Sequence, residues 1–200
     1  MNLQKTIGLN VHVDTFDGMR HGVPRLLDLF SRYGIAVTFF VPMGKDHTGR
    51  TVLRALRHPG LLLKARRGDA VSAYGLKTLL YGTLLPGPEI AEKNRDTLHR
   101  IIESSHELGI HGLDHVYWHD HIKTMTREET ERTLGQAVEV YESLIGTRPV
   151  SFAAPGWMIN RHALGFFAKR GFAYSADTRG RCPFLPRMEG RVFSVMQIPL

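Results

Sequence analysis

The densest group of residues that could carry out chemistry lies between positions 111 and 121. His111 and His115 are four residues apart, and His119 and His121 follow closely. Two imidazoles at this spacing can converge on one metal ion, and hydrolytic metal sites need three protein ligands and one open position. The segment therefore predicts part of a metal site, although a chain with 11 histidines also produces such a pair by chance.

A carboxylate is the natural third ligand, and Asp14 is the best candidate for it. Asp14 follows the first predicted strand, which covers residues 6–13 and is rich in branched side chains. The histidine pair also follows a short strand-like step that begins at Ile110. Placement of both groups at strand ends strengthens the prediction of a shared site.

Two further polar groups also follow predicted strands. The turn at Pro155, Gly156 and Trp157 comes after a strand at 150–153. Such a turn can form a wall beside a sugar, or it can be a tight connection with Trp157 in the core.

Asp177 and Arg179 follow a strand at 172–175. An aspartate and an arginine two residues apart can orient a base or hold a phosphate, or they can form an inert surface pair.

The elements that position these groups alternate between strand and helix. Helices are predicted at 23–33, 98–108, 126–145 and 161–170, and strands at 6–13, 35–41, 150–153, 172–175 and 192–198. Thr126 and Glu129 form a capping box, and Gly146 ends that helix. Strand–helix alternation predicts an α/β fold with a parallel sheet, and we favour a distorted (β/α) barrel whose functional groups gather at the carboxyl ends of the strands.

The segment from about 50 to 88 interrupts this alternation. It holds seven lysines and arginines against one acid, Asp69, mixed with leucines. No apolar run in it reaches the roughly 20 residues needed to span a bilayer. Basic residues beside aliphatic ones favour a segment that binds an anionic membrane surface. An insertion that packs its leucines on the barrel explains the same pattern.

Composition limits the class of protein. With 200 residues, 42% of them hydrophobic, we expect one domain over 1–200. Cys182 is the only cysteine, which excludes an internal disulfide, and the N-terminus lacks an export signal, which favours the cytoplasm. The net charge of +7 suits a phosphorylated substrate or anionic lipid, or is simply a solvated basic surface. The sequence lacks the basic helix or zinc-finger spacing of a nucleic-acid-binding protein.

The order of these motifs resembles the polysaccharide deacetylase family, also called NodB-like or carbohydrate esterase family 4, over nearly the whole chain. Within that family the chain is most similar to the branch of 4-deoxy-4-formamido-L-arabinose-phosphoundecaprenol deformylases. The branch is indicated by residues 22–27, 79–83 and 197–199, and by the insertion at about 50–88, which generic sugar deacetylases lack. Ala153, where generic deacetylases have an arginine, agrees with this branch.

The resemblance implies a set of roles. The implied metal ligands are Asp14, His111 and His115, and the usual ion is zinc, with cobalt, nickel or manganese as replacements. Pro155, Gly156, Trp157 and Arg179 would bind substrate, and Asp177 would support the base.

The implied reaction is hydrolysis of an N-formyl or N-acetyl group from an amino sugar linked to a polyprenyl phosphate. This reaction belongs to lipid A and lipopolysaccharide modification. The implied location is the cytoplasm, peripheral to the inner membrane.

His12 departs from the branch, whose first strand ends in two aspartates, the first acting as general base. Imidazole has an ordinary pKa near 6.5 and can accept a proton, or it can bind as a fourth ligand and close the open position. A shifted alignment would make Asp17 the important acid. We favour the unshifted alignment, because Gly8 and the residues from Asp14 to Phe16 match the branch without a gap.

The end of the sequence is a second departure. The chain stops at Leu200, in a predicted strand, whereas the family continues and supplies a late histidine as general acid. We therefore expect a fragment with an incomplete barrel. Two competing hypotheses remain: a degenerate barrel that binds metal or a lipid-linked sugar without turnover, and a generic polysaccharide deacetylase.

Overall fold

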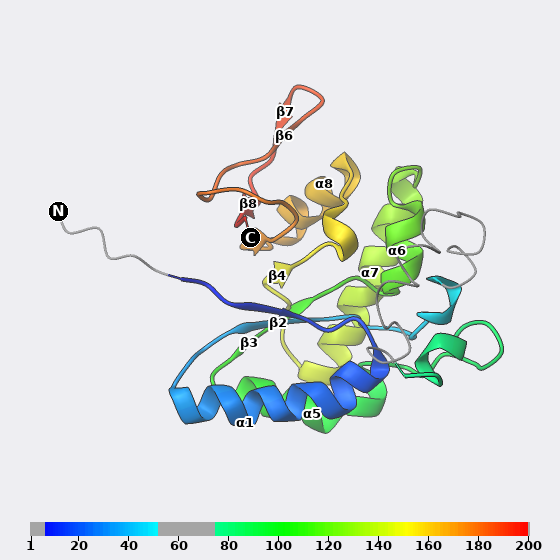
Figure 1. Ribbon diagram of the computed structural model, residues 1–200. Helices are drawn as coiled ribbons and strands as arrows, with labels where there is room; N and C mark the ends of the chain where they lie inside the picture. The colour runs from blue at the N-terminus through cyan, green and yellow to red at the C-terminus, as the bar shows by residue number, and fades with distance from the viewer. Residues whose placement is uncertain (1–6, 52–74, 200) are drawn as a thin grey trace.

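The computed structural model describes residues 7–51 and 75–199, and its centre is a curled parallel sheet (Figure 1). Six strands follow one another in the order β1-β2-β3-β4-β5-β8, and each neighbouring pair is parallel. Their bounds are β1 Asn10–His12, β2 Thr38–Val41, β3 Glu107–Ile110, β4 Ser151–Phe152, β5 Tyr174–Ser175 and β8 Met196–Gln197. In the described part of the chain β1 and β8 form the two edges, so the predicted barrel is present as an open half-barrel.

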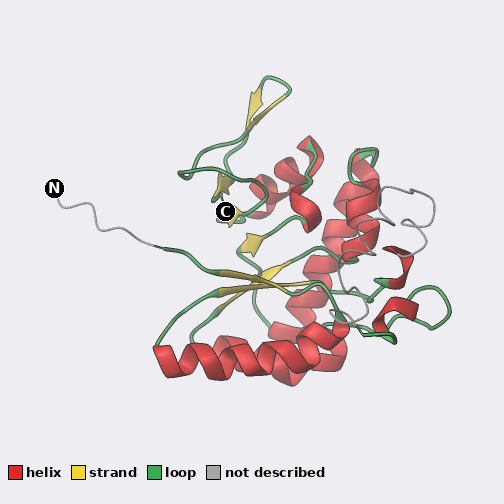
Figure 2. Ribbon diagram, in the orientation of Figure 1, coloured by secondary structure: helices red, strands yellow, loops and turns green. Residues whose placement is uncertain are grey.

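Helices cover the outside of this sheet (Figure 2). α1 (Val23–Tyr33) and α5 (Arg95–Glu103) lie side by side along one face, and α7 packs on both α5 and α8. The remaining helical elements are η1 Gly18–Gly22, η2 Thr78–Leu80, η3 Glu92–Asn94, α6 His115–His121, α7 Arg127–Ile145, η4 Pro155–Trp157 and α8 Arg161–Arg170. No helix among the described residues is both long enough and apolar enough to cross a bilayer.

Local sequence signals explain where several helices begin and end. The hydroxyl of Thr126 accepts from the backbone N–H of Glu129, whose carboxylate accepts in return from the N–H of Thr126. Gly146 ends α7 at a φ of 79°, a left-handed conformation that glycine adopts without strain. The predicted capping box is therefore confirmed. The bounds predicted for the helices at 23–33 and 161–170 also agree with α1 and α8.

The helix predicted at 98–108 is wrong in its second half. α5 ends at Glu103, Ser105 has a φ of 60°, and the chain then enters strand β3. Gly109 lies inside this strand, where a β-carbon would come within 2.5 Å of the Phe40 ring. The absence of a side chain at Gly109 therefore lets the ring of Phe40 on the neighbouring strand β2 pack directly against β3.

The single strand predicted at 192–198 is also wrong. β6 (Arg187–Met188) and β7 (Arg191–Val192) form an antiparallel hairpin, and β8 joins the main sheet separately. Buried Phe193 and Val195 turn the chain from the hairpin into the core. Most of the predicted insertion, residues 52–74, lies outside the described residues.

Candidate metal centre and active site

Asp14, His111 and His115 meet at the carboxyl ends of β1 and β3. Asp14 follows β1, His111 directly follows β3, and His115 begins α6. One potential ligand atom from each residue lies within 4.8 Å of the other two. Oδ1 of Asp14 is 3.3 Å from Nε2 of His111 and 3.5 Å from Nε2 of His115. The predicted ligand set is therefore brought together in space.

The third strand end fixes the orientation of His111. Nδ1 of this buried histidine lies 2.6 Å from the carbonyl oxygen of Ala153, directly after β4. Because a carbonyl oxygen only accepts, Nδ1 must carry the proton and donate it. In the neutral ring Nε2 then presents its lone pair toward Asp14 and His115. This is the usual arrangement of a histidine that binds a metal.

The triad fits a divalent metal ion. Oδ1 of Asp14 is buried and has no hydrogen-bond partner among the described residues. A buried carboxylate oxygen beside two imidazole nitrogens is costly unless a cation compensates it. One oxygen and two nitrogen donors suit zinc, and also cobalt, nickel or manganese, so the donor set leaves the choice of ion open.

The protonation states also suit metal binding. Burial alone would raise the pKa of Asp14, but the contact with His111 and the charge of His115 lower it below its usual value. Burial, together with the charge of His111, lowers the pKa of His115 to about 4. At neutral pH both side chains are therefore deprotonated, which is the form that binds a metal.

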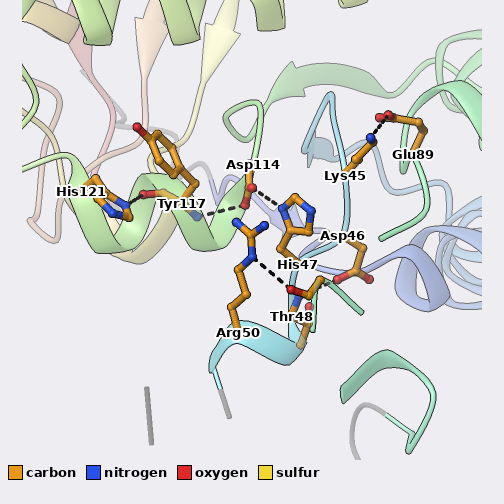
Figure 3. A network of polar contacts seen from close by, with 10 residues as sticks. Lys45, Asp46, His47, Thr48, Arg50, Glu89, Asp114, Tyr117 and His121 are labelled. Carbon is orange, nitrogen blue, oxygen red and sulfur yellow. Dashed lines mark hydrogen bonds and ion pairs between the residues drawn. The ribbon is translucent and has the colours of Figure 1, made fainter. Parts of the chain in front are cut away.

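Asp114 holds the start of α6, and therefore His115, in place (Figure 3). Oδ1 of Asp114 accepts from the backbone N–H of Tyr117 at 2.9 Å, and Oδ2 lies 2.5 Å from Nδ1 of His47. Burial opposes ionisation of Asp114, but these two hydrogen bonds keep its pKa below the usual value. Asp114 was not among the predicted site residues, although an aspartate before a helix is a typical N-cap.

A second aspartate ties the loops after β1 and β2 together. Asp46 is almost fully buried, and its two oxygens accept from the backbone N–H groups of Phe16 and Thr48 at 2.8 and 2.9 Å. Phe16 lies two residues after Asp14. Asp46 therefore holds the loop that carries the ligand, a role that no sequence motif indicated.

His12 lies beside the triad and is not part of the group of mutually close ligand atoms among the described residues. Its ring centroid is 4.7 Å from that of His111, and its buried Nε2 has no hydrogen-bond partner in the described part of the chain. Burial and the charge of His111 lower its pKa to about 4. Asp17, the acid of the shifted alignment, accepts a hydrogen bond from Thr78 at 3.1 Å and is likewise outside the triad.

The turn after β4 exposes an aromatic ring at the site. Pro155 is buried, whereas Trp157 is 44% exposed, so the core interpretation of Trp157 is wrong. Gly156 has a φ of 63°, and a β-carbon there would come within 2.5 Å of the His119 ring. The guanidinium of Arg179 lies over the Trp157 ring, 4.6 Å from its centroid. Arg179 and Trp157 therefore form one exposed surface.

Asp177 is buried behind that surface. Its carboxylate accepts from the backbone N–H of Ala154 at 2.8 Å and from the side-chain amide of Gln197 at 2.9 Å. Burial raises its pKa to about 6, although these hydrogen bonds oppose the shift. The interpretation of Asp177 as half of a surface pair is therefore wrong. Ala154 follows Ala153, whose carbonyl holds His111, so Asp177 supports the backbone that orients a ligand.

Several cavities adjoin these groups. One of about 270 Å³ is lined by Asp14, Thr15, Thr48, Thr51, His115, Val116 and His119. Another of about 360 Å³ has Trp157, Asp177 and Gln197 among its lining residues, with apolar side chains around them. Two of the three triad residues, Asp14 and His115, therefore line the first cavity, and Asp177 lines the second.

Comparison with known proteins agrees with this arrangement, because residues 10–175 match the family model described as polysaccharide deacetylase. The chain belongs to the polysaccharide deacetylase family, a family of hydrolases. A crystal structure assigned as a polysaccharide deacetylase from Mycobacterium smegmatis superposes with a TM-score of 0.63 at 19% identity, covering 96% of this chain and 57% of that one. This likeness supports the half-barrel fold.

Two curated members of the polysaccharide deacetylase family are similar to the chain in sequence. Both are named as probable 4-deoxy-4-formamido-L-arabinose-phosphoundecaprenol deformylases. The protein from Shewanella sediminis is 36% identical over 91% of this chain, and the one from Wigglesworthia glossinidia brevipalpis is 28% identical over 92%. The matched regions span 59% and 64% of these two relatives.

Proposed function

We propose that this chain is a metal-dependent amidohydrolase that removes an N-formyl or N-acetyl group from an amino sugar linked to a polyprenyl phosphate. In this proposal it acts in lipid A and lipopolysaccharide modification, in the cytoplasm and peripheral to the inner membrane. The observation that carries the proposal is the convergence of Asp14, His111 and His115 within 4.8 Å beside an open cavity. The similarity to the two deformylases supports the choice of substrate.

Asp14, His111 and His115 would hold the divalent ion. When bound, such an ion polarises the amide carbonyl and lowers the pKa of an attacking water molecule. The protein's own contribution is to keep the three donor atoms deprotonated and fixed. The carbonyl of Ala153 fixes His111, and the N-cap of Asp114 fixes the start of α6 at His115.

His12 is our proposed proton acceptor. Its pKa of about 4 makes the imidazole neutral at physiological pH, with Nε2 buried beside the triad and without a partner in the described residues. A neutral imidazole can accept a proton from water, but a base is most effective when its pKa lies near the working pH. His12 is therefore a weak general base in this proposal.

The exposed Trp157 and Arg179 would bind the substrate. An aromatic ring offers a flat apolar surface to a sugar, and a guanidinium pairs with phosphate oxygens through two parallel hydrogen bonds. Pro155 and Gly156 shape the turn that presents Trp157, and buried Asp177 supports that turn through Ala154. We propose Asp177 as a positioning residue, because its carboxylate contacts backbone and Gln197.

A degenerate barrel that binds the same metal or lipid-linked sugar without turnover is the second candidate function. The low pKa of His12 favours it, because a base that binds protons only below pH 4 gives little assistance near pH 7.

The test is formate or acetate release from a polyprenyl-phosphate-linked formamido or acetamido sugar, with bound metal measured by elemental analysis. The hydrolase proposal expects release by the wild-type chain and loss of both metal and release in Asp14→Ala. Metal binding without release in the wild type, with release gained in His12→Asp, would establish the degenerate binder. Absence of metal from the wild-type chain in metal-supplemented buffer would contradict the hydrolase proposal and the metal-binding form of the degenerate barrel.

A further inference from the structure

The hairpin β6–β7 projects away from the half-barrel and carries exposed apolar side chains. Figure 1 shows it extending beyond β8, and the structure pairs its two strands only with each other among the described residues. Leu185 is 49% exposed and Val192 is 48% exposed, and Phe184 just before them is 42% exposed. A two-stranded hairpin has little stability by itself, so apolar residues on its surface need a function or a partner.

The register separates the two faces of this hairpin. Arg187 pairs with Val192, and Met188 pairs with Arg191. Residues directly opposite each other in an antiparallel pair point to the same face. The inner face carries half-buried Met188 and places Arg191 over the ring of buried Phe193, at 5.2 Å. The outer face therefore carries Arg187 and Val192, and both are exposed.

The charged residues of the hairpin and of the segment before it are almost all positive. Residues 179–191 contain four arginines, and Glu189 is the single acid. Glu189 already forms an ion pair with Arg161 of α8. The hairpin thus presents arginine and aliphatic side chains without a free carboxylate among residues 179–191, which is the combination that binds anionic lipid surfaces.

A second exposed apolar area differs in its charges. On α1 and α5, Leu29 is 44% exposed and Ile102 is 39% exposed. Asp28 and Arg100 form an ion pair there, 3.5 Å apart, so this face carries both signs of charge. It resembles an ordinary solvated helix face, and it supplies matched control positions.

We propose that the hairpin docks the protein on an anionic lipid bilayer, with Leu185 and Val192 entering the interface and Arg187 binding headgroups. Phe184, Pro186 and Met188 line the cavity of about 360 Å³ that also contains Trp157 and Asp177. Docking through the hairpin brings this cavity to the membrane surface. That consequence rests on the proposed function, because a lipid-linked sugar is presented there. The docking itself does not depend on catalysis.

The first experiment measures co-sedimentation with vesicles of phosphatidylcholine alone and with vesicles that also contain phosphatidylglycerol. The wild-type chain is expected to bind only the anionic vesicles. The double variant Leu185→Glu/Val192→Glu, and separately Arg187→Glu, should bind at least about tenfold more weakly. The matched controls Leu29→Glu and Arg32→Glu, both on exposed positions of α1, should bind like the wild type.

The second experiment uses the single cysteine. Cys182 is exposed and lies two residues before Phe184, so it accepts an environment-sensitive fluorophore without further mutation. Anionic vesicles should shift its emission to shorter wavelength. The same label at Leu29→Cys in a Cys182→Ser background should not respond.

Equal vesicle binding by the hairpin and control variants would overturn the proposal. So would self-association of the wild type without vesicle binding, abolished in the hairpin variants, which would instead make the hairpin an interface between two copies. Neither readout uses metal or turnover. A failure of the proposed hydrolase activity therefore leaves these results unchanged.

Discussion

Asp14 and Asp177 each follow the carboxyl end of a strand of the same sheet, β1 and β5, and their surroundings are opposite. Oδ1 of Asp14 has no hydrogen-bond partner in the described residues and faces two imidazole nitrogens. Each oxygen of the Asp177 carboxylate accepts a hydrogen bond, one from the backbone N–H of Ala154 and one from the side-chain amide of Gln197. The pKa of Asp14 is lowered by the histidines, and the pKa of Asp177 is raised by burial to about 6. Asp14 is therefore placed to bind a metal ion, whereas Asp177 stabilises the folded protein.

The largest expected difference in stability separates these two residues directly. Asp177→Ala leaves the N–H of Ala154 and one of the two side-chain N–H groups of Gln197 buried without an acceptor, while the other still donates to Ser175. This should lower the free energy of unfolding by about 2 to 4 kcal/mol. Asp14→Ala removes no accepted hydrogen bond at Oδ1 and should change it by about 1 kcal/mol or less in metal-free buffer. Urea unfolding with a chelator present measures the unfolding free energy of both variants. Equal losses of stability in the two variants would contradict the different roles given to Asp14 and Asp177.

Titration of Asp177 should make the stability of the protein depend on pH. Its folded pKa of about 6 exceeds the ordinary 3.8, so between these values the folded state keeps a proton that the unfolded state has lost. Asp177 therefore contributes to the free energy of unfolding fully below pH 3.8. This contribution is lost as pH rises through about 6, and the total loss is about 3 kcal/mol.

The control is Asp177→Asn, which cannot titrate. The unfolding free energy of the wild type minus that of the variant should therefore decrease across this window. A difference that is flat or increases with pH would show that Asp177 is not the raised group.

Substitution of Asp114 should have a smaller effect, and this effect is on metal binding by the triad that contains Asp14. Asp114→Ala should weaken metal binding by about tenfold, because it releases the start of α6 and hence His115. Thr126→Ala is the matched control, since it removes an N-cap from α7 at a comparable cost of about 1 kcal/mol. Calorimetric metal titration of both variants should show weaker binding only for Asp114→Ala.

The smallest expected effect on stability concerns Arg179 on Trp157. Arg170 lies over Phe166 at 5.4 Å on α8, so it offers the same type of contact away from the site. Arg179→Ala and Arg170→Ala should each cost about 0.5 kcal/mol, which is typical of an exposed cation–π contact. Only Arg179→Ala should raise KM for the phosphate-linked substrate. If Arg179→Ala and Arg170→Ala have equal KM values, Arg179 does not contribute to substrate binding.

The sequence predicted most helix bounds, and the convergence of Asp14, His111 and His115, better than the residues that support them. The triad follows from two histidines after one strand and an aspartate after another, because parallel strands bring their carboxyl ends together. Asp46 and His47 act through loops that meet only in the folded chain, so no local pattern reveals them. The helix predicted at 98–108 was too long because its last residues belong to strand β3, and a glycine such as Gly109 is found both after helices and in crowded strands.

The most direct test of the account is a calorimetric titration of zinc or cobalt into the metal-free wild-type chain, Asp14→Ala and Asp177→Ala. The account predicts a single ion bound by the wild type through the one described triad, affinity lowered by about 100-fold or more in Asp14→Ala, and affinity within about tenfold of wild type in Asp177→Ala. Binding by Asp14→Ala as tight as that of the wild type would contradict the assignment of the triad as the metal centre.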